Sequence, residues 1–378
     1  MTASWRLLAA GCALTALGAT ACSGGGAPAA GGPSASPEAP RAKASAQPSA
    51  QASATPASTE PAPVAAGPRR PSGRPVRLAF AGDANFQGPS AAALGNGLGA
   101  VAPLLSDADL TVVNLETAVT TRGTRAAKQF AFRTPPRVFG ALARGGVDVV
   151  TMANNHGLDY GPVGLRDSLA GAREAGFPVA GIGADQDAAF APVVRTVNGQ
   201  RIAVIGATQV LDDNLAASWT AGPGKPGLAS AKDEPRLLQE VRAARARADT
   251  VVVYLHWGQE RRSCPLEVQR SLAAALVAAG ADVIVGTHAH VLLGGGYLDG
   301  AYVDYGLGNF IFAAHSALGA QSGVLTLTVR GRSVSDARWH PASIRAGQPA
   351  PLSGSAAERA GSSWQRLRGC TGLEATAD

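Results

Sequence analysis

The sequence lacks three features that would place it directly in a common class of proteins. Its apolar segment from Leu7 to Gly18 is too short to span a bilayer. None of its four cysteines has the C-x-x-C spacing of a thiolate metal site. Residues 1–75 carry six of the 33 basic and two of the 27 acidic residues, which leaves 27 basic against 25 acidic residues beyond them. Without a basic excess in that part, we expect no nucleic-acid partner.

Residues 1–75 also lack the apolar periodicity of a folded core. Arg6, the short apolar segment and the small residues Ala19-Thr20-Ala21 before Cys22 form the layout of a secretory signal. The cysteine after Ala-Thr-Ala resembles a bacterial lipoprotein cleavage site, whereas cleavage by the ordinary signal peptidase would leave Cys22 incidental. We predict a lipoprotein-type signal peptide over 1–21 and lipidation at Cys22. A disordered Ala/Pro/Ser-rich linker over 22–75 would then tether an extracytoplasmic domain to the cell membrane.

Two cysteines remain after this assignment. Cys12 leaves with the signal peptide and Cys22 carries the lipid, so Cys264 and Cys370 are left. In an oxidising exterior, such a pair predicts one disulfide that closes a long loop. The alternative is two unrelated buried thiols.

From Val76 onward, short apolar runs alternate with helical stretches, which is the pattern of an α/β domain. We predict this domain over 76–346 and a loosely ordered tail over 347–378, which is rich in Ala, Ser and Gly. The expected strands are Val76–Ala81, Leu110–Leu115, Val147–Met152, Arg201–Gly206, Thr250–Leu255, Asp282–Val285 and Ala301–Tyr305.

Helices are expected from near Asp233 and from near Ser263, each with a proline in its first turn. The second helix would bury the face that contains Val268 and Leu272 and end at Gly280. After Phe312, alternating apolar residues predict a terminal antiparallel hairpin at the edge of the sheet, with its turn at Gly331.

Polar side chains follow five of the predicted strands. The carboxyl ends of strands in α/β sheets face the ligand crevice, so these residues should converge although they are far apart in sequence. His288 and His290 should point to the same side of an extended segment. The polar groups are Asp83 after Gly82, Glu116, the run Asn154-Asn155-His156, His256, and the pair His288 and His290.

This set combines carboxylates, amide oxygens and imidazoles without a thiolate, as divalent metal sites do. A bridging carboxylate could hold two ions that clamp a phosphoryl group. Each residue also has an ordinary interpretation when taken alone. Asp83 could belong to a turn, Glu116 to a solvated loop, and His256 to the core. A purely structural role for all five groups together is much less probable than for any one of them.

The same residues resemble the bacterial capsule-synthesis CapA family, which is related to PgsA of poly-γ-glutamate synthesis. The resemblance covers Val76 to Phe312, and it implies an α/β, metallophosphoesterase-like sandwich of two sheets flanked by helices. The matching motifs are Gly82-Asp83, Asn114-Leu115-Glu116, Phe130-Ala-Phe-Arg133, Thr151-Met-Ala-Asn-Asn-His-Gly-Leu-Asp-Tyr-Gly161, Gly181-Ile-Gly183, His256-Trp257-Gly258, Gly286-Thr-His-Ala-His290 and Tyr305-Gly-Leu-Gly-Asn-Phe-Ile-Phe312.

The family is similar to the calcineurin-like metallophosphoesterases, so the resemblance implies one or two divalent ions, with manganese, zinc and iron as candidates. By motif, Asp83 and His290 would bind the first metal, and Glu116 would bridge the two. His156 would face the leaving group as a general acid or a stabiliser of the transition state. The ligands implied for the second metal are Asn155, His256 and His288.

Two positions depart from the phosphoesterase pattern. The usual D-x-H is Asp83-Ala84-Asn85 here, so one imidazole is missing and Asn85 is at best a weak ligand. Ala289 replaces the proline that often separates the last two histidines, which is a mild change. Because of the missing imidazole, the first metal would be bound less firmly. Phosphoesterase turnover, which depends on that metal, would be reduced with it.

We therefore predict a lipid-anchored, extracytoplasmic protein that acts in synthesis, anchoring or export of a capsule-type surface polymer. Poly-γ-glutamate is one candidate polymer, and the polymer and its synthase subunits are the expected partners. One alternative is a metal-dependent phosphodiesterase or phosphatase that acts on another envelope substrate. Another is a non-catalytic protein that binds the polymer or the synthase while its metal stabilises the fold.

Overall fold

The computed structural model describes residues 73–377. The predicted signal peptide, Cys22 and all but the last three residues of the predicted linker lie outside the described residues. None of the helices between residues 73 and 377 combines the length and the hydropathy that a bilayer crossing requires.

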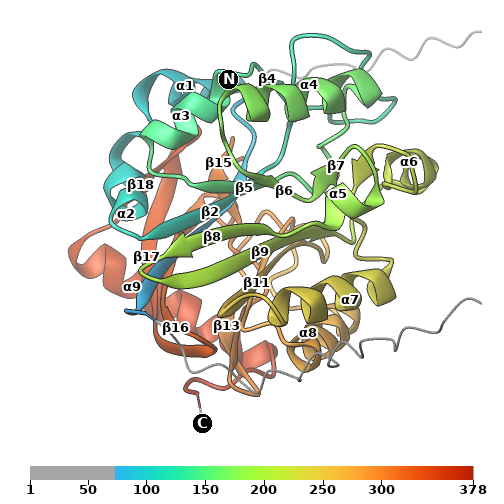
Figure 1. Cartoon of the computed structure of the whole chain (residues 1–378). Helices are drawn as coiled ribbons and strands as arrows, with labels where there is room; N and C mark the ends of the chain where they lie inside the picture. Colours follow the sequence, from blue (N-terminus) through green and yellow to red (C-terminus); the bar gives the residue numbers. More distant parts are fainter. Residues whose placement is uncertain (1–72, 378) are drawn as a thin grey trace, which may run out of the picture. The chain divides into compact units, whose positions relative to one another are not determined.

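The first sheet has eight strands and combines parallel and antiparallel pairs (Figure 1). β1 pairs in parallel with β2 and antiparallel with β16, so β1 separates the α/β half of this sheet from its antiparallel half. Its strands are β1 (Val76–Ala84), β2 (Leu110–Leu115), β5 (Val149–Thr151), β6 (Val179–Ala180), β15 (Asn309–Ile311), β16 (Gln321–Arg330), β17 (Ser333–Arg345) and β18 (Gln348–Pro351).

The second sheet has six strands, of which β9, β11, β12 and β14 run in parallel. Antiparallel strands β8 and β13 lie at its two edges. Its strands are β8 (Val193–Val197), β9 (Gln200–Thr208), β11 (Thr250–His256), β12 (Val283–Thr287), β13 (Gly295–Leu298) and β14 (Ala301–Asp304). Two further short pairs join β3 (Ala118–Val119) to β4 (Arg133–Thr134) and β7 (Ile182–Gly183) to β10 (Gly227–Leu228).

Helices cover the outer faces of both sheets, with α1, α3 and α4 above the first sheet and α7 and α8 below the second in Figure 1. The helices are α1 (Ala93–Asn96), α2 (Ala102–Ser106), α3 (Val138–Arg144), α4 (Gly161–Glu174), α5 (Gln186–Phe190), α6 (Asp213–Trp219), α7 (Glu234–Arg245), α8 (Glu267–Ala279) and α9 (Gly354–Leu367). Short 3-10 turns are η1 (Gly88–Ala92), η2 (Gly99–Val101) and η3 (Arg368–Cys370).

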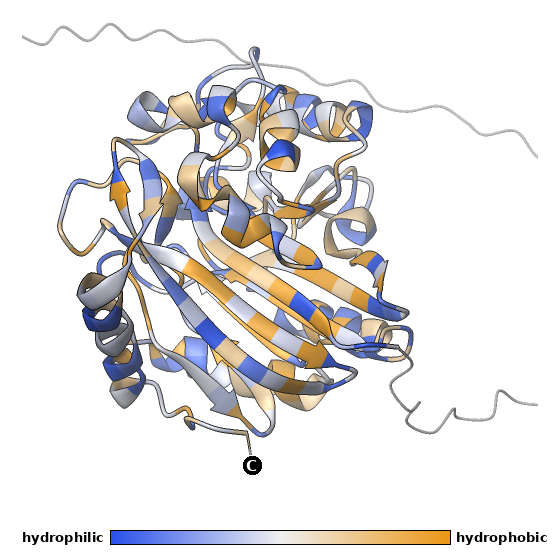
Figure 2. Cartoon of the chain, turned by 90° about the vertical axis from the view of Figure 1, so that its left-hand side faces the viewer, coloured by the Kyte–Doolittle hydropathy of each residue, from blue (hydrophilic) through white to orange (hydrophobic). Residues whose placement is uncertain are grey.

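Three hydrophobic clusters follow from this layering. One lies between the sheets, where Phe80 of β1 packs near Tyr254 of β11, and the Tyr254 hydroxyl donates to the Ala81 carbonyl. The other two lie between each sheet and its helices. The strands in the middle of Figure 2 are accordingly rich in hydrophobic residues. The predicted sandwich of two sheets flanked by helices is confirmed.

Helix α8 begins later than its sequence pattern predicts. Its first residue is Glu267, because Leu266 is extended and forms the N-cap, so that Pro265 lies before the helix and not in its first turn. The helix ends at Gly280 in a left-handed conformation, as expected, and Leu272 is buried. Val268, however, is 54% exposed and lies outside the buried face.

The predicted terminal hairpin is present as β16 and β17, but β18 pairs with β17 and forms the edge of the sheet in its place. Residues 347–377 differ from the predicted loosely ordered tail, because they contain β18 and the 14-residue helix α9. The indole of Trp364 in α9 stacks on that of Trp339 in β17, with the ring centroids 5.4 Å apart. A disulfide joins Cys370 to Cys264, with their Cα atoms 5.7 Å apart.

Candidate metal centre

The strand ends of both sheets bring the predicted polar residues together. Asp83 lies at the end of β1, and Glu116 directly follows β2, its parallel neighbour. His256 is the last residue of β11, and His288 directly follows the adjacent β12. Asn155 and His156 follow β5 in the first sheet. The predicted convergence of these residues is therefore present, at the place where the carboxyl ends of strands from the two sheets meet.

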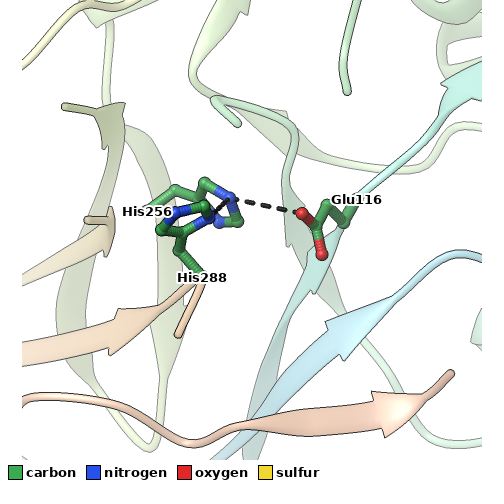
Figure 3. Close-up of side chains that lie close together, drawn as sticks. All are labelled: Glu116, His256 and His288. Atoms are coloured by element: carbon green, nitrogen blue, oxygen red, sulfur yellow. Dashed lines mark hydrogen bonds and ion pairs between the residues drawn. The ribbon is translucent and has the colours of Figure 1, made fainter. Parts of the chain in front are cut away.

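Glu116, His256 and His288 form one group that could hold an ion (Figure 3). His256 Nε2 lies 3.3 Å from Glu116 Oε1 and 3.2 Å from His288 Nδ1. The amide oxygen of Asn155 lies 2.8 Å from the same His256 nitrogen. These four residues are the set that the resemblance assigns to the second metal.

Asp83, Glu116 and His290 form a second group. His290 Nδ1 lies 3.3 Å from Asp83 Oδ2, and His290 Nε2 lies 4.0 Å from Glu116 Oε1. In both groups the candidate ligand atoms lie within 4.8 Å of one another. Glu116 belongs to both groups, as a bridging carboxylate must.

The Glu116 carboxylate carries the strongest physical signal for a cation. It is fully buried, and neither oxygen receives a hydrogen bond from any residue that the structure describes. Burial, followed by repulsion from Asp83, raises the pKa of Glu116 to about 8. Buried carboxylates are normally paired, hydrogen-bonded or bound to a metal, so a buried carboxylate that accepts no hydrogen bond and is surrounded by imidazoles fits a divalent ion.

The histidines around Glu116 differ in their protonation. Burial lowers the pKa of His256 to about 3, and burial and the neighbouring His256 lower the pKa of His288 well below its ordinary value. Burial opposes the charge on His290, but Glu116 and Asp83 outweigh it and raise the pKa of His290. His256 and His288 are thus neutral, which is the form that binds metals, whereas His290 forms an ion pair with Asp83.

His288 and His290 are not in the extended segment that their spacing suggested. Both have positive φ angles, 95° and 55°, which non-glycine residues rarely adopt. The turn divides the two imidazoles between the two candidate groups rather than placing them side by side. Backbone strain of this kind is concentrated at functional sites.

His156 belongs to neither candidate ligand group. Its Nδ1 lies 2.5 Å from Asp159 Oδ2, and its Nε2 points toward the centre, 3.9 Å from Glu116 Oε1. This placement is compatible with the predicted role of His156 toward a leaving group.

Asn85 lies near the centre but has a different role from the predicted weak ligand. Its Oδ1 accepts hydrogen bonds from the Gln87 backbone N–H at 3.1 Å and from the Ser90 hydroxyl at 3.0 Å. The oxygen that would coordinate an ion therefore stabilises the turn before η1. A ligand role for Asn85 therefore stays a prediction, and it would require Oδ1 to leave these two hydrogen bonds.

Several supporting residues carry no assignment from sequence. Asn114 donates to Asp83 Oδ1 at 2.8 Å, and Asn154 donates to the Asn114 amide oxygen at 3.0 Å. Asn309 Oδ1 lies 2.9 Å from His290 Nδ1 and orients that ring. These three residues lie inside the motifs already singled out, but a motif does not reveal which atom each side chain contacts.

The sequence profile described as "Bacterial capsule synthesis protein PGA_cap" matches residues 77–314. The chain belongs to this family. The PGA_cap match includes every residue of both candidate ligand groups and ends before β16.

Two curated relatives agree with this assignment. The capsule biosynthesis protein CapA of Bacillus anthracis is 31% identical over 259 residues, which cover 67% of this chain and 62% of that protein. The PGA biosynthesis protein CapA of Bacillus subtilis is 32% identical over 255 residues, which cover 67% and 66%. This PGA_cap chain thus spans a little under two thirds of the length of these relatives.

Solved structures are more distant. A novel phosphatase from Mycoplasma pneumoniae is 15% identical, with a TM-score of 0.47, and the match covers 72% of this chain and 94% of that one. A hypothetical protein from Thermus thermophilus is 18% identical, with a TM-score of 0.47 and coverage of 71% and 100%.

Proposed function

We propose that this PGA_cap protein acts in synthesis, anchoring or export of a capsule-type surface polymer, through a divalent-metal centre at the strand ends. The names of the two Bacillus relatives support a role with a capsule or a poly-γ-glutamate polymer. The observation that carries the metal-dependent part is Glu116, which is buried, unpaired by hydrogen bonds among the described residues and shared by two ligand groups.

Asp83, Glu116 and His290 would hold one ion, and Glu116, Asn155, His256 and His288 the other. A bound divalent ion would supply Lewis-acid activation and lower the pKa of a coordinated water. The oxygen and nitrogen donors suit manganese, zinc or iron, and the group contains no thiolate.

The chain's own contribution to the reaction would come from His156. Because the Asp159 carboxylate accepts at Nδ1, Nε2 is the nitrogen that can exchange a proton with a substrate oxygen. This arrangement also supports our second candidate function, a metal-dependent phosphodiesterase or phosphatase for another envelope substrate. The loss of a ligand at Asn85 instead favours the third candidate, a non-catalytic protein that binds the polymer or its synthase.

We further propose that a lipid on Cys22 holds the domain at the outer face of the cell membrane, close to the polymer and the synthase subunits. The support is the Ala-Thr-Ala-Cys boundary and the Ala/Pro/Ser-rich spacer after it. Cys22→Ser should move the protein from the membrane fraction to the medium and abolish labelling by a fatty-acid probe. Unchanged membrane recovery and unchanged labelling would contradict the anchor.

The central experiment replaces the gene in the producing cell with a Glu116→Gln variant. Surface polymer should fall to the level of a deletion strain, and elemental analysis of the purified variant should find less divalent metal than in the wild type. Glu267→Gln is the matched control, because Glu267 is exposed at the start of α8. Normal polymer from the Glu116 variant would refute the metal-dependent function.

A further inference from the structure

A loop of residues 120–132, between β3 and β4, contacts the turn that carries His156. The Ala126 backbone N–H donates to the Asp159 carbonyl at 2.8 Å, and the Phe132 backbone N–H donates to Asp159 Oδ2 at 2.6 Å. The Phe132 ring stacks on the His156 imidazole, with centroids 4.0 Å apart and planes 25° apart. The loop thus contacts both members of the His156–Asp159 pair.

Lys128 is a second residue of this loop that contacts the His156 turn. Its side chain is only 10% exposed, and its Nζ donates to the Asn155 carbonyl. The same Nζ lies 3.2 Å from Asp159 Oδ1 and 3.4 Å from Asp212 Oδ2, and 5.3 Å from the centroid of the Trp219 ring. One ammonium group therefore joins the loop, the His156 turn and the segment that contains α6.

The charge on Lys128 has a defined partner. Asp159 is fully buried, and a buried carboxylate needs a nearby cation or several hydrogen bonds. Among the described residues, Lys128 is the ion-pair partner of Asp159 at Oδ1, and His156 Nδ1 lies within hydrogen-bond distance of Oδ2. Removal of Lys128 would leave Oδ1 without a counter-charge, and the carboxylate would then be held at Oδ2 alone, by the Phe132 backbone N–H and His156.

We propose that Lys128 is a positioning residue for His156. It fixes the Asp159 carboxylate, and Asp159 together with the Phe132 ring fixes the imidazole with Nε2 directed at the metal centre. The inference rests on the role proposed above for His156, but the orientation of the ring can be measured without turnover. Lys128 is in neither candidate ligand group, so its loss should disturb the ring and leave metal content unchanged.

The test compares Lys128→Met, which keeps the length of the side chain without its charge, with Lys128→Arg, which keeps the charge. Lys232→Met is the matched control, because Lys232 is an exposed lysine that belongs to neither candidate ligand group. Each full-length exported protein is labelled with 15N-histidine, and the ring nitrogens are observed by NMR. His156→Ala assigns the His156 signals among the six histidines.

In the wild type and in Lys232→Met, we expect one sharp His156 signal set with the proton on Nδ1. In Lys128→Met, that set should broaden or shift toward a mixture of tautomers, and Lys128→Arg should restore part of it. If the manganese-loaded protein hydrolyses bis(p-nitrophenyl) phosphate, kcat of Lys128→Met should fall by about 10- to 100-fold with KM and metal content unchanged, the scale expected for misplacing a reacting group.

A wild-type His156 spectrum in Lys128→Met would overturn the proposal, and so would a loss of metal together with the spectral change, because Lys128 would then support the whole centre. If Lys128→Met does not fold, unaltered His156 spectra in both Lys128→Gln, which also removes the charge, and Phe132→Leu overturn it equally. Absence of turnover in the wild type would count against the enzymatic function alone, since the ring spectra still decide whether Lys128 positions His156.

Discussion

The two candidate metal positions share Glu116 but differ in the state of their other ligands. One position contains His256 and His288, whose imidazoles are neutral because they are buried. The other contains Asp83 and His290, which form an ion pair with each other, and it lacks the imidazole that a histidine in place of Asn85 would supply. An ion at the His256–His288 position meets neutral imidazoles, whereas an ion at the Asp83–His290 position must also displace a proton from His290.

Two neighbouring ligand groups therefore need not bind their ions with equal affinity. We expect one divalent ion to be held tightly by the His256–His288 group and a second to be held weakly. The missing ligand at Asn85 and the Asp83–His290 ion pair both lower the affinity of the second position.

The largest effect on metal affinity should come from replacing one histidine of either position by alanine. His288→Ala should weaken binding of the tight ion by roughly 100-fold or more, since even residues outside the ligand shell contribute 10- to 100-fold. His290→Ala should mainly weaken the second ion. Elemental analysis and calorimetric titration with manganese measure the affinity of each position. Equal losses of affinity in the two variants would contradict the proposed difference between the positions.

Proton release sharpens the same comparison. Burial raises the pKa of Glu116 to about 8, and the Glu116 and Asp83 charges raise that of His290, so the Glu116–His290 pair holds at least one proton at pH 7 in the metal-free protein. Metal binding should therefore release protons at pH 7, and the number released should fall as the pH rises to 9 and above. Titrations in buffers of different ionisation enthalpy count these protons. Metal uptake without proton release at pH 7 would argue against these ligand states.

A smaller effect is expected from Asn85→His. The imidazole should raise occupancy of the weaker position, but the variant loses the hydrogen bonds to Gln87 and Ser90, so the gain should stay below about 10-fold, the lower end for one supporting interaction. Asn85→Ala is the control, because it loses the same hydrogen bonds without adding a ligand. Equal metal content in the two variants would show that position 85 cannot reach the ion.

The smallest effect on the centre should come from the disulfide. Cys264 lies in the loop before α8, in which the Arg261 backbone N–H donates to the Ala289 carbonyl between His288 and His290. Replacement of Cys264 and Cys370 by serine should lower the free energy of unfolding by roughly 2–4 kcal/mol and leave metal content unchanged. Denaturant titration of the serine variant measures the loss of stability. Non-reducing peptide mapping of the unmutated protein checks the disulfide, and two free thiols in that map would contradict the prediction.

The sequence located the candidate ligands because each stands at the end of an apolar run. The sequence alone predicts that Asp83, Glu116, His256 and His288 converge at the carboxyl ends of the strands, since parallel strands bring those ends together. The direction of each side chain was not predictable. Asn85 stands two residues after Asp83, yet its oxygen contacts Gln87 and Ser90 in the following turn.

Composition misled at the C-terminal end of the chain. The Ala/Ser/Gly content of 347–377 suggested little order, because few apolar residues are available there to form a core. A single indole, that of Trp364 in α9, packs on Trp339 of β17, and the disulfide fixes the end. Contacts with residues already folded elsewhere stabilise this segment, and local composition does not report them.

By itself, the sequence determined the alternation of strands and helices and the polar residues at the strand ends, while the two-sheet sandwich was implied only by the family resemblance. The alternation and the polar strand ends follow from hydrophobic periodicity and from the direction of parallel strands, which are local properties of the chain. Only the tertiary structure decided that Glu116 is shared, that His290 pairs with Asp83, and that Lys128 reaches Asp159 from a loop without periodicity. Such contacts depend on how distant segments pack, because burial and neighbouring charges set both the orientation and the protonation of each group.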